Sequence, residues 1–433
     1  MQSKVVKNAS WIIGIRIIQS LLAFVIGSIT ARYLGPSNYG VIGYAQSIVT
    51  FVVPIMQLGL TAILVQELVQ NPDDEGKILG TAHLMSMISA IVCMIGVVSF
   101  AVLFNAGETE TIIVCALYSL VLLCQSFELI QYWFQAKYLA KYSSTMMLVA
   151  YVLVSGYKIF LLVSQKSVYW FAVSYALDYL LIAFGLHFIY RKMGGQGLRF
   201  SSHYARALLS KGKYYIVSGL MVTVFAQTDR IMLKQMIDET ATGFYTAATT
   251  CAGLASFFFT AVIDSMRPMV VESKAVSQEK YEKSVVQLYS VIIYSALFYS
   301  LCIFLVAPFI VRIVYGDSYL PTVPILRVIV WYSAFSVYGG AKNIWMLVEE
   351  KQKYLLVLNM GGAAINVMLN FALIPYSGAV GAAAASLVTQ ICTNVIFGFL
   401  IKELRPNNRL LLKALNPIEI FSIGKKLFCG VKH

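Results

Sequence analysis

The stretch ILGTAHLMSMISAIVCMIGVVSFAVLF, residues 78–104, indicates the fold class, because it contains no aspartate, glutamate, lysine or arginine. At about 1.5 Å of rise per helical residue, it is long enough to cross the roughly 30 Å of hydrocarbon in a bilayer. It therefore predicts a membrane-spanning helix. The first predominantly apolar run, residues 10–32, follows Lys4 and Lys7. It is too long for the apolar core of a signal peptide, so we expect it to be retained.

Comparable apolar runs recur along the whole chain, so we expect an all-α polytopic membrane protein with twelve transmembrane helices. The predicted spans are residues 10–32, 41–64, 78–104, 111–134, 145–164, 168–190, 214–234, 244–266, 286–311, 322–346, 355–375 and 379–401.

The composition of the whole chain agrees with a membrane protein. Of its 433 residues 59% are hydrophobic and 12% charged, and the mean hydropathy is +0.75, whereas soluble domains have about 45–50% apolar and about 25% charged residues. The seven cysteines are spaced singly, without a CxxC motif or a Cys/His cluster, so they indicate small core residues and no metal site. The net charge of +13 does not indicate nucleic-acid binding, because the basic residues lie between the apolar runs.

The distribution of basic residues predicts the orientation in the membrane. When the N-terminus is placed in the cytoplasm, most of the 33 lysines and arginines fall in cytoplasmic connections, as the positive-inside rule requires. An even number of spans then places both termini in the cytoplasm.

The longest inner connection divides the chain into two six-helix lobes. We expect an N-terminal lobe at 1–190, a cytoplasmic connector at 191–213, a C-terminal lobe at 214–401 and a basic tail at 402–433. The tail is partly amphipathic and is expected to rest on anionic lipid.

The two lobes show weak internal similarity. Gly40 with Ala45 reappears as Gly243 with Ala248 after a shift of 203, and a Trp and Lys-Tyr pattern from Trp133 reappears from Trp345 after a shift of 212. The similarity predicts two pseudo-symmetric bundles around a central cavity.

Three stretches carry a resemblance to a known family: ARYLGPSNYG at residues 31–40, the segment from Asp229-Arg230 through GFYTAA at 243–248, and NVMLNFALIP at 366–375 with the small residues after it. They resemble the Wzx-type polysaccharide flippases of the multidrug/oligosaccharidyl-lipid/polysaccharide exporter superfamily. The resemblance implies a flippase that moves polyprenyl-pyrophosphate-linked oligosaccharides across the bacterial cytoplasmic membrane by alternating access. It also implies contact with membrane lipid and partnership with a polysaccharide polymerase and a chain-length regulator, and it implies no cofactor.

The same stretches have simpler structural interpretations. The Gly-Pro-Ser-Asn-Tyr-Gly segment is typical of a tight helical hairpin. Asn366 and Asn370 share one helix face and need a partner across a helix interface or in a wet cavity. The small residues from Gly378 to Ala385 favour close helix packing.

Three cations within the predicted spans are candidates for binding an anionic substrate. A charge near the middle of the bilayer costs roughly 2.5–3.5 kcal/mol on insertion scales, so it should face a cavity or a partner. Arginine binds phosphate oxygens in a bidentate manner. We therefore expect Arg16, Lys158 and Arg230 to line the cavity and receive the pyrophosphate or acidic sugars. The alternative is internal ion pairing.

Three carboxylates are the possible partners of these cations and the candidates for ion coupling: Glu128, Asp178 and Asp229. Asp178 is the strongest coupling candidate, because a low dielectric disfavours the charged form of a carboxylate. A structural pair with a basic neighbour would explain it equally well. Lys342 lies near a span end and is expected to extend its ammonium group to the interface.

The sequence favours transport over catalysis. Its four histidines are isolated, and no nucleophile motif or GxxxxGK[ST] loop is present. A membrane-embedded glycan polymerase would be expected to have a large external loop, and the predicted external connections are short. A drug or cation antiporter of the same superfamily remains the main alternative, and cavity cations would argue against it.

Overall fold

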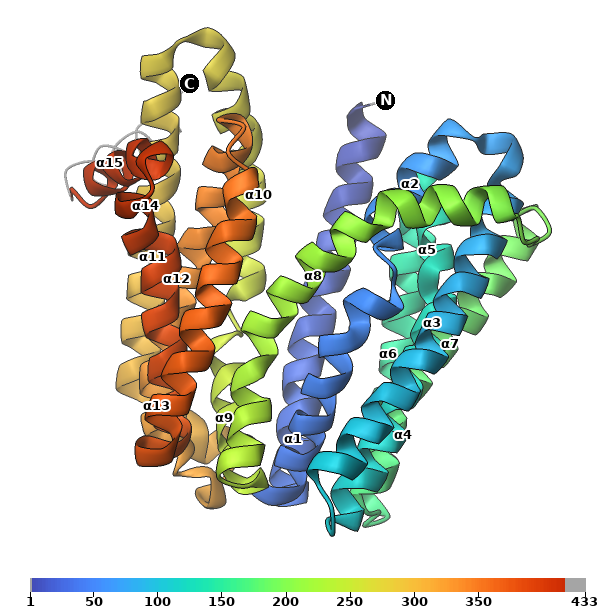
Figure 1. Cartoon of the computed structure of the whole chain (residues 1–433), viewed down its shortest axis with the longest axis horizontal. Helices are drawn as coiled ribbons and strands as arrows, with labels where there is room; N and C mark the ends of the chain where they lie inside the picture. Colours follow the sequence, from blue (N-terminus) through green and yellow to red (C-terminus); the bar gives the residue numbers. More distant parts are fainter. Residues whose placement is uncertain (1, 417–433) are drawn as a thin grey trace. The chain divides into compact units, whose positions relative to one another are not determined.

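The computed structural model describes residues 2–416, without the side chains of residues 2–13, 16 and 225. Every regular element in this part of the chain is a helix, so the predicted all-α class is confirmed. The chain forms two compact units, unit 1 from Met1 to Gly243 and unit 2 from Phe244 to His433 (Figure 1). The lobes at 1–190 and 214–401 and the cavity between them remain predictions.

Unit 1 contains eight α-helices and two short 3-10 helices within the described range. They are α1 (Gln2–Met56), α2 (Leu60–Gln70), η1 (Pro72–Asp74), α3 (Glu75–Phe104), α4 (Thr109–Ser126), η2 (Phe127–Ile130), α5 (Gln131–Ala136), α6 (Ala140–Val163), α7 (Val168–Lys192) and α8 (Ser202–Met236).

Helix α9 (Glu239–Ala252) begins in unit 1 and continues into unit 2. The other described elements of unit 2 are α10 (Ser256–Val276), α11 (Gln278–Val314), η3 (Asp317–Tyr319), α12 (Thr322–Val348), α13 (Lys353–Ile391), the π-helix η4 (Cys392–Ile396), α14 (Phe397–Leu400), η5 (Lys402–Leu404) and α15 (Arg405–Ala414).

Two of the long helices contain a break where a glycine has a positive φ. In α1 the break is at Gly35, with φ 74°, directly before Pro36. In α13 it is at Gly378, with φ 52°, three residues after Pro375. Proline removes a helical hydrogen bond, and glycine accepts a backbone conformation that other residues rarely adopt, so the helix ends and restarts there.

The break in α13 is a hairpin. The amide of Asn366 donates to the hydroxyl of Ser386 at 3.4 Å, although 20 residues of straight helix would separate them by about 30 Å. Asn370 in turn donates to Asn366 at 3.1 Å. Asn366 therefore has the predicted partner across a helix contact, on the second arm of the hairpin, whereas the contact of Asn370 with Asn366 lies within the first arm.

The number of spans differs from the sequence prediction. Nine helices of the described residues are long and apolar enough to cross a membrane, or ten if α8, which bends by 49°, is counted as one span. Two of the nine combine pairs of predicted spans, because helical backbone continues on both sides of Gly35 and of Gly378 with no loop between. The chain is thus a multi-pass membrane protein. The number of twelve transmembrane helices remains a prediction.

The surfaces of the spans are suited to a lipid environment. Large apolar side chains such as Val163, Phe184 and Phe298 are 79%, 69% and 70% exposed, which only an apolar surrounding makes favourable. Of the cysteines predicted to be core residues, Cys93, Cys115 and Cys251 are buried, Cys124 and Cys392 are half-buried, and Cys302 is exposed, while Cys429 lies outside the described residues.

The first part of the predicted tail packs on protein. In α15 the buried Asn407 accepts a hydrogen bond from Tyr289 at 2.5 Å and donates one to Tyr338 at 3.0 Å. Ser290 donates to the carbonyl of Ala414 at 3.0 Å. Helix α15 is therefore docked on α11 and α12 by buried polar contacts. Contact of the tail with anionic lipid stays a prediction, and its residues 417–433 lie outside the described part.

Two of the stretches that carry the family resemblance contact each other at glycines. A Cβ atom added to Gly40 would overlap the carbonyl group of Glu239, and one added to Gly243 would overlap that of Pro36. The contact is reciprocal, because Gly243 follows Gly40, and Glu239 follows Pro36, by the same shift of 203. The internal similarity of the sequence thus coincides with a close approach of two backbones.

We predict that Asn407→Ala lowers the stability of the protein. The substitution leaves the hydroxyls of Tyr289 and Tyr338 without a buried partner, at a cost of about 1–3 kcal/mol. Thermal unfolding of the purified protein should show a lower Tm. Arg409→Ala, at an exposed position of the same helix, is the control and should leave the Tm unchanged.

Candidate functional site

Unit 1 contains all six residues that the sequence singles out as binding or coupling candidates. Five of them have described side chains: Glu128 in η2, Lys158 on α6, Asp178 on α7, and Asp229 and Arg230 on α8. Arg16 lies on α1, but its side chain is outside the described part of the structure. None of the roles predicted for these residues is decided by their positions alone.

Lys158 is a buried cation that faces an aromatic ring. It is 8% exposed, and its Nζ lies 4.0 Å from the centre of the Tyr175 ring on α7. The ring quadrupole attracts an ammonium group in this position, and the attraction strengthens where water is excluded. The sequence predicts a cation at this depth but gives no indication of its aromatic partner.

Two carboxylates lie within electrostatic range of one another near Lys158. Asp178 interacts with the charges of both Lys158 and Glu128, and Glu128 also has a hydrogen bond with Gln131. No salt bridge among the described residues links Lys158 to either carboxylate. Oδ1 of Asp178 is buried and has no hydrogen-bond partner in the described structure. The group therefore combines one cation with two acidic residues without closing into an ion pair.

Arg230 on α8 lies within electrostatic range of a second tyrosine, which packs near Tyr175. Its charge acts on the hydroxyl of Tyr118, and the rings of Tyr118 and Tyr175 are 4.9 Å apart. Lys158 and Arg230 are thus associated with the two members of one tyrosine pair. We call Lys158, Arg230, Asp178 and these tyrosines the charged cluster.

A second charged group in unit 1 surrounds Lys234, the last residue of the predicted span 214–234, which the sequence does not single out. Its side chain is 4% exposed, and Nζ contacts Glu108 at 2.7 Å and Glu239 at 3.3 Å. Ser37 donates to Glu239 at 3.3 Å. The lysine therefore links the start of α4 and the start of α9 at the place where Gly40 and Gly243 meet.

Hydrogen bonds beside Lys234 extend this connection. Gln235 donates to the hydroxyl of Tyr44 at 2.6 Å, and Tyr44 donates to Asn105 at 2.9 Å. Partial burial opposes ionisation of Glu108, but the hydrogen bonds from Lys234 and Thr111 outweigh it, so the pKa of this carboxyl is lowered.

The lowered pKa of Glu108 predicts a pH-dependent contribution to stability. Because the folded-state pKa lies below the ordinary value of 4.5, this contribution is present above pH 4.5 and is lost as the pH falls through the folded-state value. Glu108→Gln should therefore lower the Tm at pH 7, and the difference from the unmodified protein should shrink in acid. An equal difference at both pH values would contradict the assignment.

Lys342 in unit 2 does not extend to the interface as predicted. It is 3% exposed, and its Nζ donates to the carbonyl of Thr393 in the π-helix η4 at 3.0 Å. A π-helix leaves carbonyl groups displaced from the usual ladder, which gives the ammonium group an internal acceptor. The prediction of snorkelling is wrong here because such a local irregularity has no signal in the sequence.

One polar cavity lies between α1, α5 and α6 of unit 1. It has a volume of about 280 Å³, and its polar lining consists of three amides and two hydroxyls, from Gln19, Gln131, Gln135, Ser143 and Ser144. Gln131 also has a hydrogen bond with Glu128, so the cavity lies beside one of the three carboxylates predicted from the sequence.

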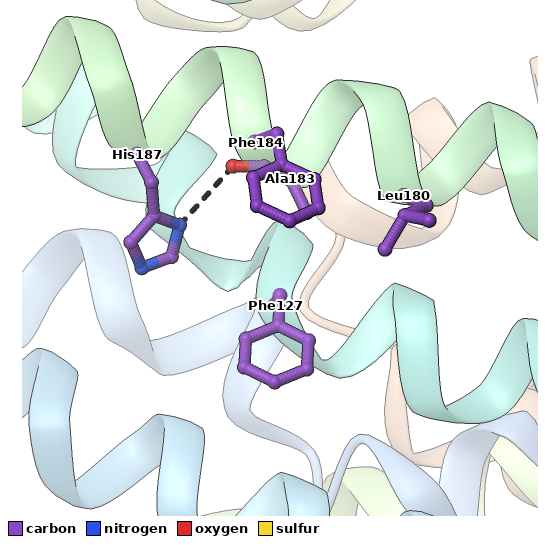
Figure 2. A pocket seen from close by; sticks show the side chains of 5 residues that line it. All are labelled: Phe127, Leu180, Ala183, Phe184 and His187. Atoms are coloured by element: carbon purple, nitrogen blue, oxygen red, sulfur yellow. Dashed lines mark hydrogen bonds between the residues drawn. The ribbon is translucent and has the colours of Figure 1, made fainter.

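A cavity of similar size between η2 and α7 has a different character. Figure 2 shows Phe127 opposite Leu180, Ala183 and Phe184, with His187 at one end, where its Nδ1 lies 3.2 Å from the carbonyl oxygen of Ala183. The lining is apolar, and Phe184 is 69% exposed. Such a surface is suited to hydrocarbon and offers nothing to a phosphate.

A comparison with family models gave a match over more than half of the chain. The model of a family described as polysaccharide biosynthesis protein matches residues 5–274. A search of curated proteins gave no match.

Among the residues that the structure describes, no group of three or more His, Cys, Asp or Glu side chains could hold a metal ion.

Several solved structures have a similar fold at low sequence identity. The structure of the lipid II flippase MurJ in an inward closed conformation has a TM-score of 0.71 and 12% identity, and the match covers 94% of this chain and 92% of that one. An inward-facing multidrug resistance MATE family transporter of the MOP superfamily gives 0.61 and 14%, with 93% and 95% covered. A MATE transporter of Vibrio cholerae gives 0.54 and 12%, with 95% and 98% covered.

Proposed function

Since the chain belongs to the polysaccharide biosynthesis protein family, we propose that it is a flippase for lipid-linked oligosaccharides. In this role it moves polyprenyl-pyrophosphate-linked repeat units from the cytoplasmic to the outer leaflet of the bacterial cytoplasmic membrane, for the synthesis of a surface polysaccharide. A polysaccharide polymerase and a chain-length regulator would act on the unit after its transfer.

The observation that carries this proposal is the charged cluster. Lys158 is buried beside Tyr175, and Arg230 acts on the neighbouring Tyr118, so two cations are held in a region where charges are costly. An anionic pyrophosphate offsets such charges, and a guanidinium group binds its oxygens in a bidentate manner. The drug or cation antiporter would instead have to attract cations, which these residues repel.

The proposed mechanism is alternating access. The pyrophosphate and sugars occupy a polar cavity that opens first to the cytoplasm and then outward, while the polyprenyl chain remains in the lipid. The sugars then cross without contacting hydrocarbon. Asp178 is the proposed coupling residue, because its buried Oδ1 has no hydrogen-bond partner in the described structure and its carboxylate senses the charge of Lys158.

Charge reversal at the binding cations should stop transport. We predict that Arg230→Glu and Arg16→Glu each abolish surface polysaccharide while leaving the amount of protein in the membrane unchanged, because the substituted carboxylate repels pyrophosphate. Arg230→Lys should retain part of the activity. Lys192→Glu, at an exposed position, is the matched control for charge. Normal polymer from both reversed variants would contradict the role of these cations.

Replacement of the coupling candidate should remove the response to a proton gradient. In liposomes, transport of the lipid-linked substrate by the unmodified protein should rise when a gradient is imposed, and Asp178→Asn should reduce or remove this rise. Asp73→Asn, at an exposed site, is the control. A full response in Asp178→Asn would limit the residue to a structural role.

A further inference from the structure

The polar cavity of unit 1 has the chemistry of a sugar site. Its described polar lining consists of Gln19, Gln131, Gln135, Ser143 and Ser144. Each amide both donates and accepts hydrogen bonds, and so does each hydroxyl. Sugar hydroxyls have the same dual character, whereas a phosphate accepts only.

Most of this hydrogen-bonding capacity is unused within the protein. Ser143 donates to the carbonyl of Ala140 at 3.0 Å, and Gln131 contacts Glu128. Among the hydrogen bonds of the described residues, none engages the side chain of Gln19, Gln135 or Ser144. Within the described part of the structure these three groups are therefore available to a ligand, and replacing them removes no hydrogen bond between described residues.

The lining also limits the size of the ligand and indicates its polarity. The described lining residues are amides, hydroxyls and apolar side chains such as Ile15 and Met147, whereas the side chain of Arg16, which follows Ile15 on α1, is outside the described part of the structure. Sugars present an apolar ring face together with their hydroxyls, which such a mixed lining matches. The volume of about 280 Å³ is at the lower end of the roughly 300–1,000 Å³ of ligand pockets, so it suits one ring rather than a chain of rings.

The position of the cavity along α6 separates it from the charged cluster. Ser144 and Lys158 are 14 residues apart on this continuous helix, which corresponds to about 21 Å. A sugar attached directly to a pyrophosphate at Lys158 would not reach the cavity, whereas a sugar several units further along an oligosaccharide would.

We infer that this cavity binds one sugar of the oligosaccharide, several units from the pyrophosphate. The inference rests on the proposed flippase function and adds to it a site that distinguishes a glycosylated carrier from a bare one. Gln135 and Ser144 are its specificity residues, and Gln131 connects it to Glu128.

Binding measurements with two probes test the inference. The probes are bare polyprenyl pyrophosphate and the lipid-linked oligosaccharide fraction extracted from cells in which the chain is native, each titrated onto the full chain in nanodiscs. The test variant combines Gln135→Leu with Ser144→Ala. The control is Gln66→Leu, an exposed glutamine of α2 outside this lining.

The unmodified protein should bind the glycosylated probe more tightly than the bare one. The double variant should lose about tenfold in affinity for the glycosylated probe and retain its affinity for bare pyrophosphate, since two hydrogen bonds to the sugar are removed. Gln66→Leu should change neither affinity. The single variant Ser144→Ala should show a smaller loss in the same direction.

Other results would overturn the inference. Unchanged affinity of the double variant for the glycosylated probe would show that the cavity does not contact sugar, and an equal loss for both probes would show that it does not distinguish them. Failure of the unmodified protein to bind either probe would instead refute the flippase function itself. Lys158→Gln should weaken the binding of both probes, which separates the two sites.

Discussion

Hydrocarbon offers no hydrogen-bond partner to a peptide group, and the architecture of this chain follows from that constraint. Every regular element among the described residues is a helix, so the backbone is satisfied within each segment. At two places the chain turns without a loop, because Gly35 and Gly378 each interrupt otherwise helical backbone. Asparagine side chains in α13 meet part of the same requirement, because Asn366 accepts a hydrogen bond from Asn370 and donates one to Ser386.

The same constraint explains why the charged residues are grouped. Lys158 has the face of Tyr175, Lys342 has a π-helix carbonyl, and Lys234 has two glutamates. These three lysines use three different kinds of partner, and only the last is a conventional ion pair. A lysine that is satisfied by a ring or a carbonyl keeps its charge available to an anion, whereas one paired with carboxylates serves to hold helices together.

Long apolar runs predict helices well when their ends are marked by polar loops. The run at 168–190 corresponds to α7 (Val168–Lys192), and the run at 322–346 to α12 (Thr322–Val348). The predicted helix boundaries are wrong where a helix continues through polar residues. Helix α8 is an example, because it begins at Ser202 whereas the predicted span begins at 214. The depth of Lys158 and Arg230 within the predicted spans identifies them as candidates. Their tyrosine partners cannot be identified in this way, because these lie on other helices. The role of Lys234 escapes prediction for the same reason, since Glu108 is 126 positions away.

The reciprocal contact of Gly40 with Glu239 and of Gly243 with Pro36 has the form of an isologous interface, in which the same patch is used twice. A shorter polypeptide with one such glycine would present the same patch in each copy, so the patch would be complementary to itself. A bulkier residue in either copy would exclude its partner. In this chain both patches belong to one polypeptide, so their contact forms independently of protein concentration.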